Sequence, residues 1–305
     1  MGYFAGLLVK LPAVIYNADM FLFNAWQFTL SCYLISIVLF FQLYKAAVTG
    51  AKHDGAATIL LQIVGSTAAV LLMPFFSFTI PTDWKTYVLL LAACVFYALN
   101  DRMQTTARRE LQVSTIAVLN QMTNVFLILI GVLVFHEALV GMKLLGAGLI
   151  LLANFLLVYS KGKVEINKHT LVAVAANLFF AVAISIDIGI SELFNLPFYI
   201  VVTLGVPGLF IALLEKISFK QIAAEFVPAK RKTILAAGTI WTLVILFSLR
   251  TFQLGEVTTV VPLQASSVLL SIILAFFWFG EKENWLKKIV AGLLVLAGVT
   301  AIVMG

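Results

Sequence analysis

The chain has 305 residues, of which 62% are apolar and 11% are charged, and its mean hydropathy is +1.08. A soluble domain carries about 25% charged residues, so this composition excludes an ordinary soluble enzyme or binding domain. It predicts a protein whose surface faces lipid. The 20 Lys and Arg residues exceed the 14 Asp and Glu residues, and they lie mostly in short connections between apolar segments. We attribute this excess to membrane topology, and we do not expect nucleic acid as a partner.

Ten apolar segments are long enough to cross a bilayer as helices. Residues 1–19 are unassigned because Lys10 and Pro12 interrupt a short apolar stretch. Three interpretations of this segment stay open: an eleventh helix, an interfacial segment, or sequence upstream of a start at Met20. The ten predicted spans are 24–44, 57–79, 84–103, 113–135, 139–159, 170–190, 197–214, 233–254, 257–280 and 286–304.

The two halves of the chain resemble each other at an offset of 144 residues, which places 113–159 on 257–303 without a gap. The same offset lays the first three spans over the sixth to eighth. Each half then holds five spans, an odd number, so the second half enters the membrane from the opposite side. The predicted fold is therefore an all-α polytopic membrane protein of two inverted five-helix repeats, 20–160 and 161–305. Secondary transporters often have this design. The matches between rarer residue types are Glu137 with Glu281, Lys143 with Lys287 and Gly148 with Gly292.

Short motifs recur at the ends of the fourth and ninth spans and along the fifth and tenth. They are Val257–Leu263, Phe279–Lys282 and Ala291–Gly298, with looser first-half counterparts at Phe135–Glu137 and Gly148–Asn154. Over about residues 24–304 the pattern resembles EamA-type members of the drug/metabolite transporter superfamily. The resemblance implies a ten-helix fold with a central cavity lined mainly by spans 1, 3, 4, 6, 8 and 9. It implies a transport mechanism without fixing a substrate. The chain departs from the pattern at Val118, which stands where the second half has Pro262.

Asp187 and Arg250 are ionisable side chains inside predicted spans. An unpaired charge at mid-bilayer costs about 2.5–3.5 kcal/mol on insertion scales. Both residues fall late in spans that run in the same direction, so we expect them at similar depth. They are predicted to pair, or Arg250 meets an anionic group while Asp187 binds a cation or proton. The alternative is that each side chain reaches the membrane interface.

A polar stripe marks the fourth and ninth spans. Asn120, Thr123 and Asn124 follow the spacing of one helical face, and Gln121 adds further polarity. The offset of 144 puts Gln264 and Ser267 at equivalent positions, with Ser271 continuing that face. We predict a substrate cavity between the two spans; the alternative is hydrogen bonding between helices, worth about 0.6 kcal/mol per contact. The predicted substrate-binding set is Asn120, Gln121, Thr123, Asn124, Asp187, Arg250, Gln264, Ser267 and Ser271.

Other polar and small residues are assigned structural roles. Asp101 and Arg102 are predicted to form a solvated boundary at the end of the third span, and Glu137 and Glu281 to cap helix ends. Small residues on spans 5 and 10 predict close helix contact, either between the halves or between two copies in a homodimer. They are Gly146, Gly148, Gly292, Ala297 and Gly298.

These patterns favour a secondary transporter that moves a small metabolite by alternating access, driven by a proton or counter-solute. An amino acid, a drug-like solute and a nucleotide-sugar-like solute are all compatible substrates. No Gly-x-x-x-x-Gly-Lys-[Ser/Thr] loop occurs, so ATP-driven transport is not expected. Ionisable residues are too scattered for a lipid-modifying enzyme. We expect no enzyme activity, cofactor or metal. The alternative function is a non-catalytic membrane subunit or a flippase for a lipid-linked head group.

The expected location is a prokaryotic cytoplasmic membrane. Ten spans place sixteen Lys and Arg residues on one side and four on the other. The positive-inside rule then puts both ends of the ten-span unit outside. The family resemblance implies that both termini are cytoplasmic, so the orientation stays open.

Overall fold

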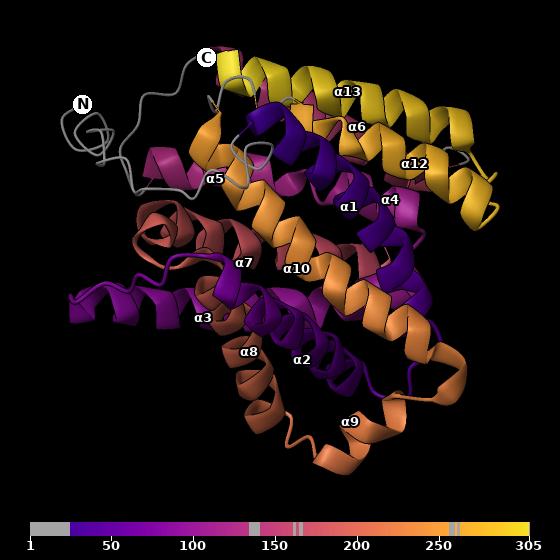
Figure 1. Cartoon of the computed structure of the whole chain (residues 1–305). Coiled ribbons are helices and arrows are strands. Elements are labelled where there is room, and N and C mark those ends of the chain that lie inside the picture. The colour runs from indigo at the N-terminus through magenta and orange to yellow at the C-terminus, as the bar shows by residue number, and fades with distance from the viewer. Residues whose placement is uncertain are drawn as a thin grey trace.

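The computed structural model describes residues 25–133, 141–160, 163–164, 167–255, 260 and 263–304. These residues form a bundle of helices with one short antiparallel pair of strands (Figure 1). The unassigned residues 1–19, the loop with Glu137, and Pro262 lie outside the described residues. The helices are α1 (Trp26–Val48), α2 (Asp54–Leu72), α3 (Trp84–Glu110), α4 (Val113–Leu119), α5 (Met122–Leu133), α6 (Gly141–Val158), α7 (Lys168–Ile190), α8 (Leu196–Leu214), α9 (Phe219–Glu225), α10 (Arg231–Leu254), α12 (Ser267–Trp278) and α13 (Trp285–Met304). Three 3₁₀ turns, at Met73–Phe75, Ser191–Leu193 and Pro228–Lys230, and the strands β1 (Tyr159–Ser160) and β2 (Lys163–Val164) complete the described elements.

Seven helical segments of the described chain are long and apolar enough to span a membrane by length and composition. They include α1, α2, α7, α8, α10 and α13, with α4 and α5 counted together as one segment. α6 and α12 are apolar but shorter, and each borders residues outside the described ranges. The chain is therefore an α-helical integral membrane protein, as the composition predicts.

Polar residues at the borders of the apolar segments begin the helices. The side chain of Asn167 accepts a hydrogen bond from the first turn of α7, and Asn195 does the same for α8. Asp83 caps α3, and Ser218 and Gln221 form a reciprocal capping box on α9. Such caps bind backbone N–H groups that the first helical turn leaves without partners.

Helices of the two halves occupy matching positions along the chain. Adding 144 to the bounds of α2 gives 198–216, within two residues of α8, and the same addition places α6 at 285–302, on α13. The packing pattern also keeps its form when the halves are exchanged. α3 packs on α7 as α10 packs on α1, and α5 packs on α7 as α12 packs on α1. α2 pairs with α8, and α6 with α13, which lie side by side at the top of Figure 1.

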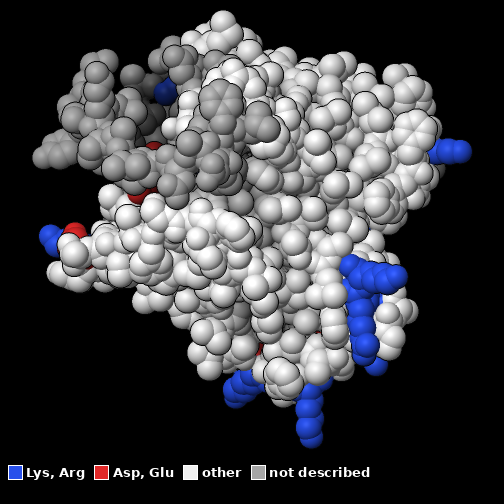
Figure 2. Space-filling view, in the orientation of Figure 1, with Lys and Arg blue, Asp and Glu red and all other residues white. Residues whose placement is uncertain are grey.

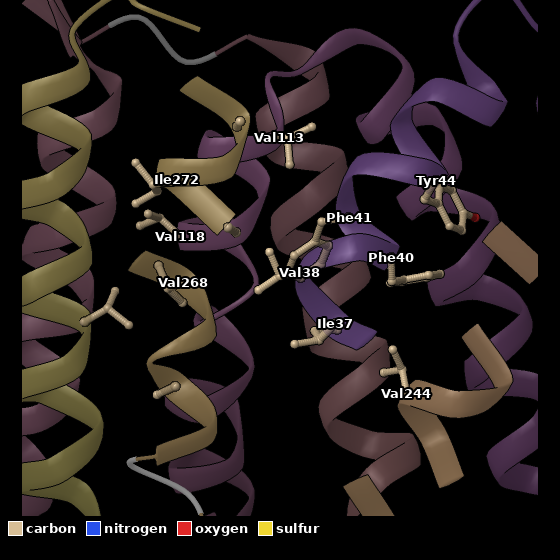
Figure 3. Close-up of a cluster of buried hydrophobic side chains, with 14 of the residues drawn as sticks. Ile37, Val38, Phe40, Phe41, Tyr44, Val113, Val118, Val244, Val268 and Ile272 are labelled. Atoms are coloured by element: carbon tan, nitrogen blue, oxygen red, sulfur yellow. The ribbon is translucent and has the colours of Figure 1, made fainter. Parts of the chain in front are cut away.

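The largest apolar core joins the two halves. Ile37 and Val38 of α1 lie between Val244 of α10 and Val268 of α12 in the close-up, and Val118 of α4 faces α12 (Figure 3). The core is thus formed by helices that are distant in sequence. Removing apolar surface from water contributes about 25 cal/mol per Å². This contribution is largely missing between helices in a membrane, because lipid is itself apolar. Shape complementarity between α1, α4, α10 and α12 therefore holds the halves together.

Loops on the side predicted to be basic meet at one end of the bundle. The Glu225 carboxylate accepts hydrogen bonds from the backbone N–H groups of Lys52 and His53, at 3.0 and 2.8 Å. At the other end, Asn195 donates to the carbonyl of Ser77 at 2.7 Å. Lys and Arg side chains gather around α9 and the adjoining helix ends in Figure 2. This arrangement agrees with the predicted alternation of loops, and which end faces the cytoplasm stays a prediction.

α6 and α13 cross at two glycines within one chain. A Cβ atom on Gly146 would lie 2.4 Å from the carbonyl oxygen of Gly298, and one on Gly298 would lie 2.8 Å from that of Gly146. No side chain fits at such a distance, so the small residues permit the close approach. The structure thus uses Gly146 and Gly298 between the halves, and a homodimer through these helices stays a prediction.

The glycine crossing gives a matched pair of substitutions. We expect Gly146→Ala to destabilise the protein by about 1–3 kcal/mol, because the new methyl group overlaps α13. Gly148→Ala adds the same methyl group to the same helix, where nothing lies within 4 Å. It should leave stability equal or slightly higher. Thermal unfolding of both purified variants in one detergent measures the difference; equal melting temperatures would contradict the crossing.

Candidate functional site

Polar side chains line the face of α3 that points into the bundle. Tyr97, Asp101, Gln104 and Arg108 recur at intervals of four, three and four residues, which places them on one side of the helix. Asp101 and Gln104 are each 6% exposed, and Arg108 is 7% exposed. Groups so far from water need partners inside the protein, and α3 finds them on α1, α2 and α7 and at Asn120, the residue that follows α4.

Asp187 of α7 is held by two tyrosines. Its Oδ2 accepts a hydrogen bond from the hydroxyl of Tyr97 on α3, and its Oδ1 accepts one from the hydroxyl of Tyr199 on α8. The side chain is buried, and no ion pair joins Asp187 to Arg250. The predicted pair is therefore not formed in this conformation. Among the described residues the donors to this carboxylate are uncharged, and they lie at the contact of three helices.

Asp101 is a second buried carboxylate, and it lies on α3 one turn beyond Tyr97. Gln62 Nε2 of α2 donates to Asp101 Oδ2 at 2.8 Å, and Asn100 Nδ2 donates to Oδ1 at 2.8 Å. The prediction of a solvated boundary is wrong for Asp101, because α3 continues to Glu110 instead of ending at 103. Arg102 lies on the same continuing helix, half-buried, and pairs with Glu215 at 2.5 Å.

Asn120 joins the polar face of α3 to α7. Gln104 Nε2 donates to Asn120 Oδ1 at 3.0 Å and to Asn177 Oδ1 at 3.2 Å. Asn177 Nδ2 in turn donates to the carbonyl of Leu119 at 2.9 Å, and Thr123 Oγ1 lies 3.5 Å from Asn177 Oδ1. Two of the predicted residues, Asn120 and Thr123, therefore share one buried amide cluster with α3 and α7.

The fourth predicted span is interrupted inside this cluster. α4 ends at Leu119 and α5 begins at Met122, and the N–H groups of Gln121, Thr123 and Asn124 bond three residues back instead of four. A turn of the same kind precedes α12, where the N–H of Ser266 bonds to the carbonyl of Leu263. Discontinuous helices in transporters expose backbone groups near the membrane midplane.

The remaining predicted residues do not join one cavity. Asn124 donates to Gln121 at 3.0 Å, both half-buried on the first-half side. In the second half, Gln42 of α1 donates to the carbonyl of Ser271 at 3.3 Å. Ser267 is buried and Gln264 is half-buried beside this contact. α12 thus directs its polar face toward α1, while α4 and α5 direct theirs toward α3 and α7.

Arg250 is buried near the end of α10, and its Nη1 donates to Gln253 Oε1 at 3.2 Å on the same helix. The predicted residues therefore do not form one site. Asp187, Asn120 and Thr123 contact the polar face of α3 or its partner Asn177, and the others lie elsewhere. The predicted site did not include Tyr97, Asp101, Gln104 and Asn177. The four-three spacing of Tyr97, Asp101 and Gln104 on α3 was a usable signal, but the nearby charges of Arg102, Arg108 and Arg109 resembled a span border.

Glu281 ties the two halves together at the basic end. Its carboxylate accepts hydrogen bonds from the backbone N–H of Val113 at 2.8 Å and of Ser114 at 3.2 Å, and from the Ser114 hydroxyl. Lys288 lies 3.7 Å away and completes the ion pair. The predicted capping role is confirmed, but the capped helix is α4 of the other half. A carboxylate at a helix N-terminus also gains from the helix dipole.

This contact predicts a stability difference between two neighbouring glutamates. Glu281→Gln should lose about 1.5–3 kcal/mol, because a neutral amide accepts weaker hydrogen bonds from α4 and no longer pairs with Lys288. Glu283→Gln removes the same charge from an exposed position of the same loop and should change little. Equal unfolding temperatures for the two variants in detergent would argue against the contact.

Comparisons with known proteins reveal the fold but no family. No family model matches the sequence, and no curated protein matches it. Nineteen chains of solved structures match. One of them, described only as "Crystal structure of protein", has a TM-score of 0.58 at 15% sequence identity. The match covers 89% of this chain and 96% of that chain, so the two share an overall fold over nearly their full lengths.

Proposed function

We propose that the chain is a secondary transporter of a small solute that works by alternating access, with ten spans arranged as two inverted five-helix repeats. The observation that carries the proposal is the pair of buried carboxylates, Asp101 and Asp187, along the inner face of α3. Ionisable groups within membrane spans are costly and commonly mark ion or substrate pathways. Asp187 lies where α3 of the first half meets α7 and α8 of the second, and Asp101 lies on α3 one turn beyond Tyr97, bonded by Gln62 and Asn100 of the first half.

The arrangement of the carboxylates supports coupling to a proton or cation. Tyr97, Tyr199, Gln62 and Asn100 are uncharged donors, so no described cation within ion-pair distance balances either aspartate. A carboxylate with such partners keeps the capacity to take up a proton or a small cation. Uptake would weaken the bonds from Tyr97 and Tyr199, and these bonds hold α3, α7 and α8 together. Binding at Asp187 would therefore change the packing between the halves.

The exchangeable packing of the halves supports the inverted repeat. Helix bounds agree within about three residues at the offset of 144, and two extensive cross-half contacts, α3 with α7 and α2 with α10, have counterparts after exchange in α10 with α1 and α8 with α3. In transporters with inverted repeats, one repeat rocks against the other so that opposite faces open in turn. A non-catalytic membrane subunit would need no buried carboxylates, and this favours transport over that alternative. A flippase for a lipid-linked head group is the second outcome of the test below.

The first test is uptake and counterflow of pooled metabolites in proteoliposomes. We expect Asp187→Asn and Asp101→Asn to lower gradient-driven uptake by at least about tenfold, equivalent to about 1.4 kcal/mol, because the coupling group is lost. Asp83→Asn is the matched control, since Asp83 lies at the exposed start of α3 and asparagine also caps helices. It should retain full uptake.

Asn120→Ala should weaken uptake by raising the KM, because Gln104 loses one of its two amide partners near the helix interruption. If Asp187→Asn, Asp101→Asn and Asn120→Ala all transport as the unmodified protein does, the site assignment fails. If no soluble pool moves but a fluorescent lipid exchanges between leaflets, the flippase alternative replaces the proposal.

A further inference from the structure

A buried guanidinium that has no ion-pair partner among the described residues lies toward the basic end of α3. Arg108 is 7% exposed, and its Nε is buried without a hydrogen-bond partner. None of the ion pairs among the described residues includes it. Asp101, two turns away on the same face, is bonded by Gln62 and Asn100 instead. A buried charge without an ion-pair partner is costly, so its surroundings need an explanation.

Three aromatic rings of α1 hold this guanidinium. The Cζ atom of Arg108 lies 5.4 Å from the ring centre of Phe40, 4.8 Å from that of Phe41 and 4.9 Å from that of Tyr44. Figure 3 shows these rings along one turn of α1. The negative ring faces offset part of the desolvation of the cation. The rings accept no conventional hydrogen bond from the guanidinium, so its N–H donors keep their capacity to bind an anion.

Arg108 lines a pocket together with a second cation. In this conformation the pocket is too tight to hold a water molecule, and its lining comprises Phe41, Lys45, Arg108, Leu111, Val113 and Ile116. Lys45 Nζ donates to the carbonyl of Arg109 at 2.6 Å, and an ammonium has three donors, so it can also bind a ligand. The wall at Val113 is the first residue of α4, which Glu281 holds. Admission of a ligand therefore requires the first turn of α4 to move.

We propose that Arg108 and Lys45 form a binding subsite for an oxyanion, the carboxylate or phosphate group of a solute that enters from the basic end of the bundle. This proposal rests on the transport function proposed above and restricts its substrate class to anions. A guanidinium binds two oxygens of one oxyanion in a planar fork, and the ammonium adds a second charge. An anionic phospholipid head group offers the same chemistry, so the test separates the two sources.

The test measures binding of inorganic phosphate and malonate to the purified chain in phosphatidylcholine nanodiscs, by isothermal titration. Arg108→Gln should weaken binding by about tenfold or more, and Lys45→Gln should weaken it less. Arg231→Gln is the matched control. Arg231 also lies over an aromatic ring, 5.4 Å from the ring centre of Phe226, but it is exposed on the basic end. Its loss should leave the affinity unchanged.

Each outcome decides the proposal. Equal affinity in Arg108→Gln and the unmodified protein overturns it. If Arg108→Gln does not fold, Arg108→Lys keeps the charge without the fork and should still weaken binding; unchanged affinity then overturns the proposal. Native mass spectrometry tests whether the site holds an anionic lipid. Phosphatidylglycerol retained by the unmodified protein and lost from the Arg108 variant supports the oxyanion site with a lipid as its ligand. Binding of neither soluble anion and no retention of lipid overturns it.

The same experiment keeps this inference separate from the transport function. Anion binding that depends on Arg108 supports the subsite even if the proteoliposomes transport nothing, a result that counts against transport alone. Solute uptake that is unchanged in both Arg108→Gln and Lys45→Gln overturns the subsite and leaves the transport function standing.

Discussion

Polar groups buried between lipid-facing helices must find their partners inside the bundle, and α3 presents more of them than any other described helix. Its inner face carries a tyrosine, an aspartate, a glutamine and an arginine in successive turns, and five other helices close around it. Tyr97 reaches Asp187 of α7, Gln104 reaches Asn120 and Asn177, and Arg108 lies against the rings of α1. In hydrocarbon these contacts have no water to replace them, so they fix which helices surround α3. The candidate site is therefore part of what holds the first half against the second.

The contacts between halves are of two kinds, and they differ in how easily they can be rearranged. The crossing of α6 and α13 at Gly146 and Gly298 brings the two backbones together with isoleucine side chains packed beside them, and it can shift little without a clash. The contacts of Asp187, Asn120 and Glu281 are hydrogen bonds that end at side chains, and each can be exchanged for a ligand, a proton or another donor. A rigid α6–α13 pair beside a polar interior that can be rearranged suits rocking of the halves about one edge. That division of roles accords with alternating access.

Composition and spacing were sufficient to predict the helical membrane fold and most helix positions. Asn120, Thr123 and Asp187 stood out because amide, hydroxyl and carboxylate groups are rare in apolar segments, and the structure buries their contacts between helices. Pairing was not predictable from sequence. Asp187 and Arg250 share a predicted depth, yet depth does not determine which helices adjoin, and Asp187 meets tyrosines of α3 and α8. Asp101 was misassigned for a related reason: its charged neighbours mark the end of an apolar segment, whereas burial depends on how far the helix continues and which side faces inward.

The central claim is that buried carboxylates on and beside α3 couple solute movement to the movement of a proton or cation. The most direct measurement is the internal pH of proteoliposomes loaded with a pH-sensitive dye, recorded after addition of a solute identified by uptake. For a proton-coupled carrier, the account predicts a solute-dependent pH change with the unmodified protein. In Asp187→Asn that change should disappear, while exchange of labelled for unlabelled solute continues. A pH change of equal size in Asp187→Asn, or gradient-driven accumulation that survives the loss of both Asp101 and Asp187, would contradict the account.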